Sequence, residues 1–335
     1  MCHYVEHRSR RIAILACDGV RTLDVTGPLE VFDVARTLGY DYAVSLHTYG
    51  DSSAIRCSSG LTLAATPAAL LDMAPDTLIL IGGKSYTCEP VPPYVQESVR
   101  TRTAGVRRIA AIDAGVFALG ATGLLDGRRA TTHWRHLDAF VTRCPSTIVD
   151  RESVFVRDED IWTAAGSAAG IDLALALVAD DHGADLAHEI SREMVVLSRR
   201  MEGHPQISAS ARTPRPKHAE LERLMATVSA DPAGHYELDV VAAQIGMSPR
   251  HLARLFKAQV GVTLRQYVYE VRLENAVGLV LAGESFHAAA QRSGLRYGAR
   301  IRDHLEAHRV LPAPTRPAPL LVDPGGAEAV PIYAG

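Results

Sequence analysis

Apolar and polar positions follow two different patterns along this chain, and the change comes near residue 200. Before it, short runs rich in β-branched residues predict strands, and stretches of helical periodicity lie between or after them. This alternation is typical of an α/β fold in which helices cover both faces of a mostly parallel sheet. We expect strands at residues 11–17, 42–49, 77–81, 107–112, 154–157 and 161–164, and helices at 28–38, 167–181 and 184–199.

After residue 216 the strand pattern disappears. Expected helices cover residues 217–229, 238–245, 249–260, 264–282, 286–292 and 299–308. Between the halves, Gly, Pro, Ser and Arg interrupt the periodicity and predict a linker, and the proline-rich end of the chain predicts a flexible tail. The chain therefore divides into an α/β domain at 11–200, a linker at 201–216, an all-α domain at 217–312 and a tail at 313–335.

The all-α half contains the pattern of a helix-turn-helix twice. This motif needs a small residue inside its first helix and a glycine about four positions later, where the turn requires a positive φ. Ala242 and Gly246 have this spacing, and Ala290 and Gly294 repeat it 48 residues later. The long helix expected between them would hold two units at a fixed separation, suited to successive major-groove segments of DNA.

The helix expected at 249–260 has an apolar side and a basic side. Leu252, Leu255 and Phe256 would pack inward, whereas the opposite side offers donors for phosphates and guanine edges. A plain helical bundle also places Ala and Gly four apart. The repeat, the basic side and the helix caps expected from Ser248, before Pro249, and from Thr263 together favour DNA binding. The candidate DNA-contacting residues are Ser248, Arg250, His251, Arg254 and Lys257 in the first unit, and Arg296 and Arg300 in the second.

Composition and charge agree with this division. The chain has 335 residues, of which 47% are apolar, and its net charge is −3. Residues 245–302 nevertheless carry nine basic residues against three acidic ones, which suits a segment facing nucleic acid, although a solvated basic face looks the same. No apolar run approaches the roughly 18 residues that span a bilayer and no secretory signal is evident, so a cytoplasmic protein is expected.

Five cysteines are present, and no pair has the spacing of a metal knuckle or a redox motif. We therefore expect neither disulfides nor a cysteine-based zinc site. No other metal site and no cofactor is predicted.

Residues 107–120 predict a strand, a sharp turn and a helix. This elbow lifts a side chain above a sheet and directs a helix N-terminus at a ligand. Asp113, Ala114 and Gly115 would form the turn. Gly82 and Gly83 end a second strand, and their backbone N–H groups would lie alongside, as in an oxyanion hole.

Residues 217–312 resemble the AraC-type DNA-binding domain, most closely in VAAQIGMSPRHLARLFKAQVGVTLRQYVYEVRLENA of the first unit. The second unit departs from the family, which has a Cys-Gly-Phe turn and two phenylalanines in its last recognition helix. Ser293, Gly294 and Leu295 form the turn here, and Ile301 and Leu305 replace the phenylalanines, allowing one inserted residue.

The same register puts Asp303 opposite Arg254 and Glu306 opposite Lys257. Acidic groups repel phosphate. The second unit is therefore expected to contribute less to DNA affinity than the first, or to read DNA differently.

Residues 11–200 resemble the class I glutamine-amidotransferase-like superfamily, in the branch of the intracellular-protease-like and parkinsonism-associated proteins. The resemblance implies a flavodoxin-like, doubly wound sheet sandwich. It is carried by four stretches, which are DGVRTLDVTGPLEVFD, LILIGG, AIDAGVFALGATGLLDGRRATTHW and WTAAGSAAGIDLALALV.

That branch usually has a cysteine at the elbow and an acidic residue after the first strand. Asp113 stands in place of the cysteine, Asp24 in place of the acidic partner, and His133 in the family's Thr-Thr-His-Trp stretch. A carboxylate is a poor nucleophile for amides, so we expect a retained ligand pocket, with an inert elbow and true catalysis as alternatives. The candidate ligand-binding residues are Asp24, Gly82, Gly83, Asp113, Ala114, Gly115 and His133.

If Asp24 and Asp113 form a close acid pair, one carboxyl has a raised pKa and the pocket favours a cationic amine. The two resemblances together imply a homodimeric transcriptional regulator that binds promoter DNA and senses a small molecule, not an enzyme. Two alternatives are a hydrolase or hydratase fused to a DNA-binding domain, and a partner-binding module that has lost DNA affinity.

Overall fold

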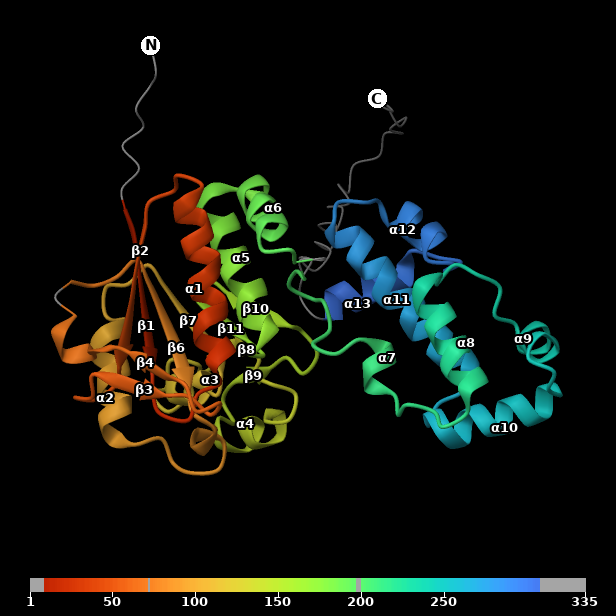
Figure 1. The fold of residues 1–335 in the computed structure, drawn as a ribbon, viewed down its shortest axis with the longest axis horizontal. Helices are drawn as coiled ribbons and strands as arrows, with labels where there is room; N and C mark the ends of the chain where they lie inside the picture. The colour runs from red at the N-terminus through yellow and green to blue at the C-terminus, as the bar shows by residue number, and fades with distance from the viewer. Residues whose placement is uncertain (1–8, 72, 197–199, 308–335) are drawn as a thin grey trace, which may run out of the picture.

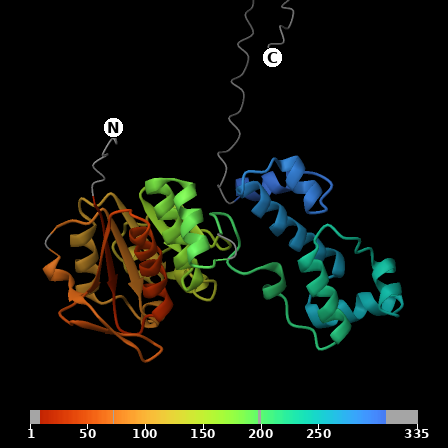
Figure 2. The same ribbon diagram turned by 45° about the horizontal axis from the view of Figure 1, so that its top comes forward.

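The computed structural model describes residues 9–71, 73–196 and 200–307. Figure 1 shows an α/β body, coloured red to green, and a helical body, coloured green to blue, which are joined by a segment containing the short helix α7 (Ala209–Arg212). Figure 2 shows the same two bodies from another direction. The expected fold class is therefore confirmed, whereas the tail predicted at 313–335 lies outside the described residues.

A seven-stranded sheet organises the first domain, in the order β10-β11-β7-β6-β1-β2-β5. Neighbouring strands are parallel except β10 and β11, which form the antiparallel hairpin that the sequence predicts. The strands are β1 (Arg10–Ala16), β2 (Tyr42–Thr48), β5 (Thr66–Pro67), β6 (Thr77–Gly82), β7 (Arg108–Asp113), β10 (Phe155–Asp158) and β11 (Ile161–Ala164). Two small pairs outside this sheet were not predicted, β3 (Ala54–Arg56) with β4 (Thr62–Ala64) and β8 (Arg129–Ala130) with β9 (Ile148–Val149).

Helices cover both faces of the sheet, and β1 shows why. Ile12 and Ile14 belong to one buried cluster, whereas Ala13 and Leu15 belong to the other, because successive strand side chains point to opposite faces. The first cluster is closed by α1 (Thr22–Thr37), α5 (Ala168–His182) and α6 (Ala184–Glu193). The second is closed by α2 (Pro93–Thr103), α3 (Gly115–Gly120) and α4 (Leu137–Arg143), with 3₁₀ turns at Ala68–Leu70 and Lys84–Thr87.

Helix α1 begins six residues before the predicted start at Pro28, which lies inside the helix. A proline inside a helix removes one backbone hydrogen bond. This part of α1 packs closely against α5. A Cβ on Gly27 would lie only 2.9 Å from the side chain of Ile171, so the position has room for glycine alone. The early start matters for the site, since it puts Asp24 in the first turn of α1, fully buried.

The second domain contains the six predicted helices, with bounds that differ from the predictions by at most two residues. They are α8 (Ala219–Ala230), α9 (Leu238–Gln244), α10 (Pro249–Val260), α11 (Leu264–Leu281), α12 (Phe286–Arg292) and α13 (Ala299–Ala307). Helix α11 belongs to both units, because Tyr267 packs with Phe256 in one cluster and Val277 packs with Ile301 in the other. It therefore holds the units at a fixed separation, as predicted.

Among the described residues, no helix is both long enough and apolar enough to cross a membrane.

Candidate functional site

The first helix-turn-helix has the predicted turn. Ala242 is fully buried, Gly246 has a φ of 68°, and the N–H of Met247 donates to the carbonyl oxygen of Ala242 at 2.9 Å. Ser248 then caps α10, since its Oγ accepts the backbone N–H of His251 at 3.3 Å. Ser248 was predicted as a DNA contact, and its hydroxyl here holds the start of the recognition helix.

The basic side of α10 faces solvent. Leu252 and Phe256 are fully buried, whereas the side chains on the opposite side are exposed. Three residues on this side are cations, Arg250, Arg254 and Lys257. Within the part of the chain that the structure describes, they form no ion pair and no side-chain hydrogen bond. The exposed residues of this side are Arg250, His251, Arg254 and Lys257. The charges of the three cations are thus available to phosphates and base edges.

The second unit repeats the turn. Gly294 has a φ of 72°, and the N–H of Leu295 donates to the carbonyl oxygen of Ala290 at 2.8 Å, as Met247 does in the first unit. The replacements for the two phenylalanines, Ile301 and Leu305, are fully buried, as the register predicts.

Of the two acidic residues in the second recognition helix, Asp303 is exposed and Glu306 is half-buried. Arg296 and Arg300 are exposed as well. The second unit therefore presents both signs of charge, whereas α10 presents only cations.

A groove of about 1040 Å³ lies between the two units, over α11. Arg265, Arg296 and Arg300 line it, together with Tyr297, Glu237 and apolar side chains such as Val268, so that cations border a mostly apolar groove. Arg272 also lines the groove, but its guanidinium donates to the carbonyl oxygens of Pro232 and Gly234, each at 2.8 Å, and holds the α8–α9 loop. Sequence reasoning missed Arg265, which lies on the connecting helix α11, and Tyr297.

In the first domain, Asp113 forms the predicted elbow at the carboxyl end of β7. Its φ of 52° is rare for a residue other than glycine and stores strain. Neighbouring glycines permit this geometry, since a Cβ on Gly166 would lie 2.5 Å from the Cβ of Asp113 and one on Gly115 would lie 2.1 Å from the carbonyl oxygen of Leu80. The hydroxyl of Thr132 donates to the carbonyl oxygen of Asp113 at 2.8 Å.

Asp24 and Asp113 lie close enough for their charges to interact, as the predicted acid pair requires. Burial, followed by the charge of Asp24, raises the pKa of Asp113 to about 7, against the opposing effect of Arg21. Burial also raises the pKa of Asp24, although the N–H of Ser167 donates to its Oδ1 at 2.5 Å. Oδ2 of Asp24 and Oδ1 of Asp113 are buried and accept no hydrogen bond from any described residue. Oδ2 of Asp113 lies 3.9 Å from Nε of Arg21.

The predicted pair of oxyanion-hole donors is incomplete. Gly82 is paired with Asp113 in the sheet register and is therefore adjacent to the elbow. The N–H of Gly83, however, donates to Sγ of Cys17 at 3.1 Å and is not free for a ligand. Ala114 and Gly115 are buried behind the elbow.

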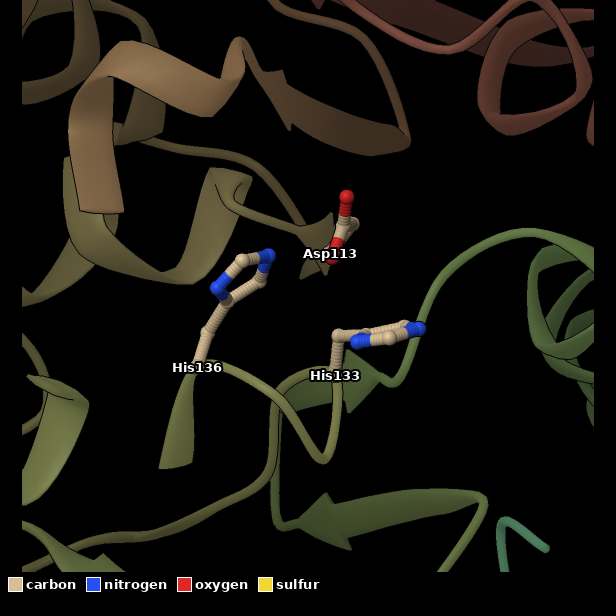
Figure 3. A group of neighbouring side chains, drawn as sticks. All are labelled: Asp113, His133 and His136. Atoms are coloured by element: carbon tan, nitrogen blue, oxygen red, sulfur yellow. The ribbon is translucent and has the colours of Figure 1, made fainter. Parts of the chain in front are cut away.

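His133 lies beside the elbow with a second histidine, His136, that sequence reasoning missed. Both rings are half-buried, their centroids are 5.4 Å apart, and His133 also stacks on Trp134 at 5.6 Å. Figure 3 shows the two imidazoles beside Asp113. The available signal was the His-x-x-His spacing directly after the Thr-Thr pair.

Comparison with known proteins follows the same division. Residues 10–180 match the DJ-1/PfpI family, and residues 241–311 match a helix-turn-helix domain. The chain is 36% identical to HTH-type transcriptional regulator ArgR of Pseudomonas aeruginosa, over 50% of this chain and 51% of that protein, so that it spans about half the length of this relative. It is 29% identical to HTH-type transcriptional regulator GbdR of the same species, over 79% of this chain and 72% of that protein.

An enzyme is also similar, isonitrile hydratase of Pseudomonas putida, with 32% identity over 55% of this chain and 77% of that protein. The crystal structure of an AraC family transcriptional regulator from Pseudomonas putida shares the fold, with a TM-score of 0.50 and 24% identity over 55% of this chain and 99% of that one.

The chain thus joins an α/β domain that contains the elbow to a domain with two helix-turn-helix units. This chain belongs to the DJ-1/PfpI family and carries an AraC-type helix-turn-helix domain after it, so that both predicted resemblances are confirmed.

Proposed function

We propose that this protein is a sequence-specific DNA-binding transcriptional regulator whose DJ-1/PfpI domain senses a small molecule. The observation that carries the proposal is the repeated helix-turn-helix with its first recognition helix, α10. This helix exposes Arg250, Arg254 and Lys257, which have no ion-pair partner among the described residues. A cationic row with an apolar back is what a helix needs in the major groove. The protein would act in the cytoplasm on promoter DNA.

The two units have unequal tasks in this proposal. Helix α10 supplies base and phosphate contacts, and the groove over α11 offers Arg265 and Arg296 to the phosphates between them. The second recognition helix carries Asp303 on its exposed side and adds less attraction. The affinity for DNA therefore depends mainly on the first unit.

The segment between the domains contacts both of them and offers the sensor a route to the reader. Gln206 donates from Nε2 to the carbonyl oxygen of Thr132 at 2.9 Å, and Thr132 in turn donates to Asp113. Further along, the N–H of Ala209 donates to Oε2 of Glu274 on α11 at 2.7 Å. A ligand at the elbow regulates only if it binds two states of this connection with different affinity.

The effector that the acid pair favours is a cationic amine. Asp24 and Asp113 each keep one buried carboxyl oxygen that has no hydrogen-bond partner in the part of the chain that the structure describes. A protonated amine would supply both the missing donors and the missing charge. Homodimerisation accompanies sensing in this proposal, because the resemblance to the regulators implies it, and sedimentation of the full chain tests it.

Catalysis at the elbow is the second candidate, favoured by the strained φ of Asp113 and by the similarity to an isonitrile hydratase. The carboxylate is a poor substitute for a thiolate. Cys17, which follows β1, is no replacement, because burial raises the pKa of its thiol and keeps it protonated. A turnover screen on amides, isonitriles and glyoxals would support an enzyme if it found activity that Asp113→Asn abolishes.

Mapping of the genomic sites bound by the full chain tests the regulator proposal. We expect a small set of sites upstream of genes, sharing a sequence motif, and we expect these sites to be lost when Arg250 and Arg254 are both replaced by alanine. Binding without a shared motif, or sites that the double variant retains, would contradict the proposal.

A further inference from the structure

Asp113, His133 and His136 bring three potential metal ligands together at the elbow (Figure 3). One carboxylate oxygen and one ring nitrogen from each histidine lie within 4.8 Å of one another. The three residues come from two places in the chain, the carboxyl end of β7 and the loop before α4. This loop is itself ordered by a turn in which the N–H of His136 donates to the carbonyl oxygen of His133 at 2.7 Å.

A second, independent observation points to a missing ligand. The side chain of Asp113 is 8% exposed, and its Oδ1 is buried with no hydrogen-bond partner within residues 9–71, 73–196 and 200–307. A buried carboxyl oxygen without a partner is costly, and a bound cation would compensate it.

We propose that the elbow of this protein binds a divalent transition metal of the zinc class through Asp113, His133 and His136. Two imidazoles and one carboxylate are a recurrent ligand set for such ions, and three protein ligands leave coordination positions open for water or a small molecule. Imidazole nitrogen argues against Mg²⁺ and Ca²⁺, which prefer oxygen ligands. The absence of paired cysteines therefore does not exclude a metal, since this ligand set requires none.

Two groups compete with the metal. Arg21 lies 3.9 Å from Oδ2 of Asp113, but its side chain is half exposed and can swing into solvent. The backbone N–H of Arg135 donates to Nδ1 of His133 at 3.3 Å, a long hydrogen bond that coordination through this nitrogen would replace. The charge of Asp24 acts in favour of the metal, because it offsets that of Arg21.

This inference concerns the elbow alone and stands whether or not the chain binds DNA. A metal and a protonated amine would compete for Asp113, so that the two ligand classes are experimentally separable. A metal with open coordination positions would instead bind an effector that donates a lone pair to it.

The test uses the untagged full chain after treatment with a chelator. Zn²⁺ binding is measured by calorimetry, and Co²⁺ binding by its visible d–d absorption, which reports the ligand geometry directly. We expect one ion per chain, with affinity reduced by about 10- to 100-fold or more in His133→Ala and in His136→Ala. Asp113→Asn keeps the shape of the elbow and should weaken binding as well.

His188→Ala, which removes an exposed histidine from α6 of the same domain, is the matched control and should bind as the wild type does. Circular dichroism of each variant separates lost binding from lost folding. The absence of a Co²⁺ absorption band in the wild type would overturn the proposal. Equal affinities in the wild type and in folded His133→Ala and His136→Ala would do the same, since they would place the ion elsewhere.

Discussion

Gln206 donates a hydrogen bond from its side chain to the carbonyl oxygen of Thr132, 2.9 Å away. Its Nε2 also lies 3.1 Å from Oγ1 of Thr131 and 3.2 Å from the carbonyl oxygen of Ser153. The segment predicted as a linker is therefore attached to the α/β domain beside the elbow, and not a free tether. Its composition predicts the break in periodicity but not these contacts, which depend on the tertiary fold.

Replacement of Gln206 by alanine should release this segment. The change leaves the buried carbonyl oxygens of Thr132 and Ser153 without this donor, which costs about 1–3 kcal/mol of unfolding free energy. Limited proteolysis should then cut near residue 206 faster than in the wild type. Gln244→Ala, at an exposed position of α9, is the control. Equal cleavage rates in both variants would show that the contact does not hold the segment.

Replacement of Asp113 by alanine should weaken the binding of a cationic amine. The variant loses one of the two carboxyls that favour a positive charge at the elbow. Calorimetry with a panel of primary, secondary and quaternary amines measures the effect, with the exposed Asp126→Ala as the control. If every amine that binds the wild type binds Asp113→Ala equally well, the effector site lies elsewhere.

The ion pair of Arg108 and Asp181 should make the α/β domain sensitive to acid. Burial alone would raise the pKa of Asp181, but the charges of Arg108 and Arg107 lower it below its ordinary value of 3.8. Oδ2 of Asp181 lies 2.5 Å from Nη2 of Arg108, and both side chains are buried. A lowered pKa in the folded state stabilises the fold above pH 3.8, and this stabilisation is lost as the pH falls through the folded value.

Asp181→Asn should therefore cost about 3–5 kcal/mol of unfolding free energy at neutral pH, because it leaves Arg108 buried without this charged partner. The difference from the wild type should shrink below pH 3.8. Denaturant unfolding at neutral pH and below pH 3.8 measures the difference in unfolding free energy. Asp185→Asn, at an exposed site on α6, should show neither the loss of stability nor its dependence on pH. A difference that stays constant with pH would contradict the assigned role of the pair.

Opposite charges at equivalent positions of the two units should have opposite effects on DNA binding. Arg254→Ala should weaken specific binding by about 1–3 kcal/mol, which is about 5- to 150-fold in affinity. Asp303→Asn should tighten it by a smaller factor, because it removes an exposed negative charge from the second recognition helix. Asp51→Asn changes the net charge equally in the other domain and controls for charge alone. If Asp51→Asn tightened binding as much as Asp303→Asn, the effect would come from net charge and not from the position of Asp303.

The helices of the second domain could be predicted closely because local signals mark where they begin. Helices α10 and α12 have the predicted bounds, and each begins after a serine whose hydroxyl accepts a backbone N–H, Ser248 for α10 and Ser285 for α12. Strand β7 could be predicted because both of its faces are buried, which leaves a continuous apolar run. Helix α2 could not, since only Val95 and Val99 of its residues are buried, and one pair of apolar positions is too few to mark a helix.

The acid pair could be predicted from a resemblance, whereas the histidine cluster could not. Asp24 and Asp113 stand at positions that the family marks, and the structure brings their charges together. His136 meets Asp113 only because the loop before α4 folds back on the end of β7, a contact that no local pattern encodes. Similarly, the engagement of the Gly83 N–H depends on Cys17, 66 positions away in the chain.

The salt dependence of DNA binding tests the regulator proposal most directly. Fluorescence anisotropy of the full chain with an upstream fragment should give an affinity whose logarithm falls linearly with the logarithm of salt concentration. Lys257→Ala should reduce that slope by about 1, and a scrambled fragment should bind more weakly than the upstream one at every salt concentration. A flat salt response, or equal affinity for both fragments, would contradict sequence-specific recognition through α10.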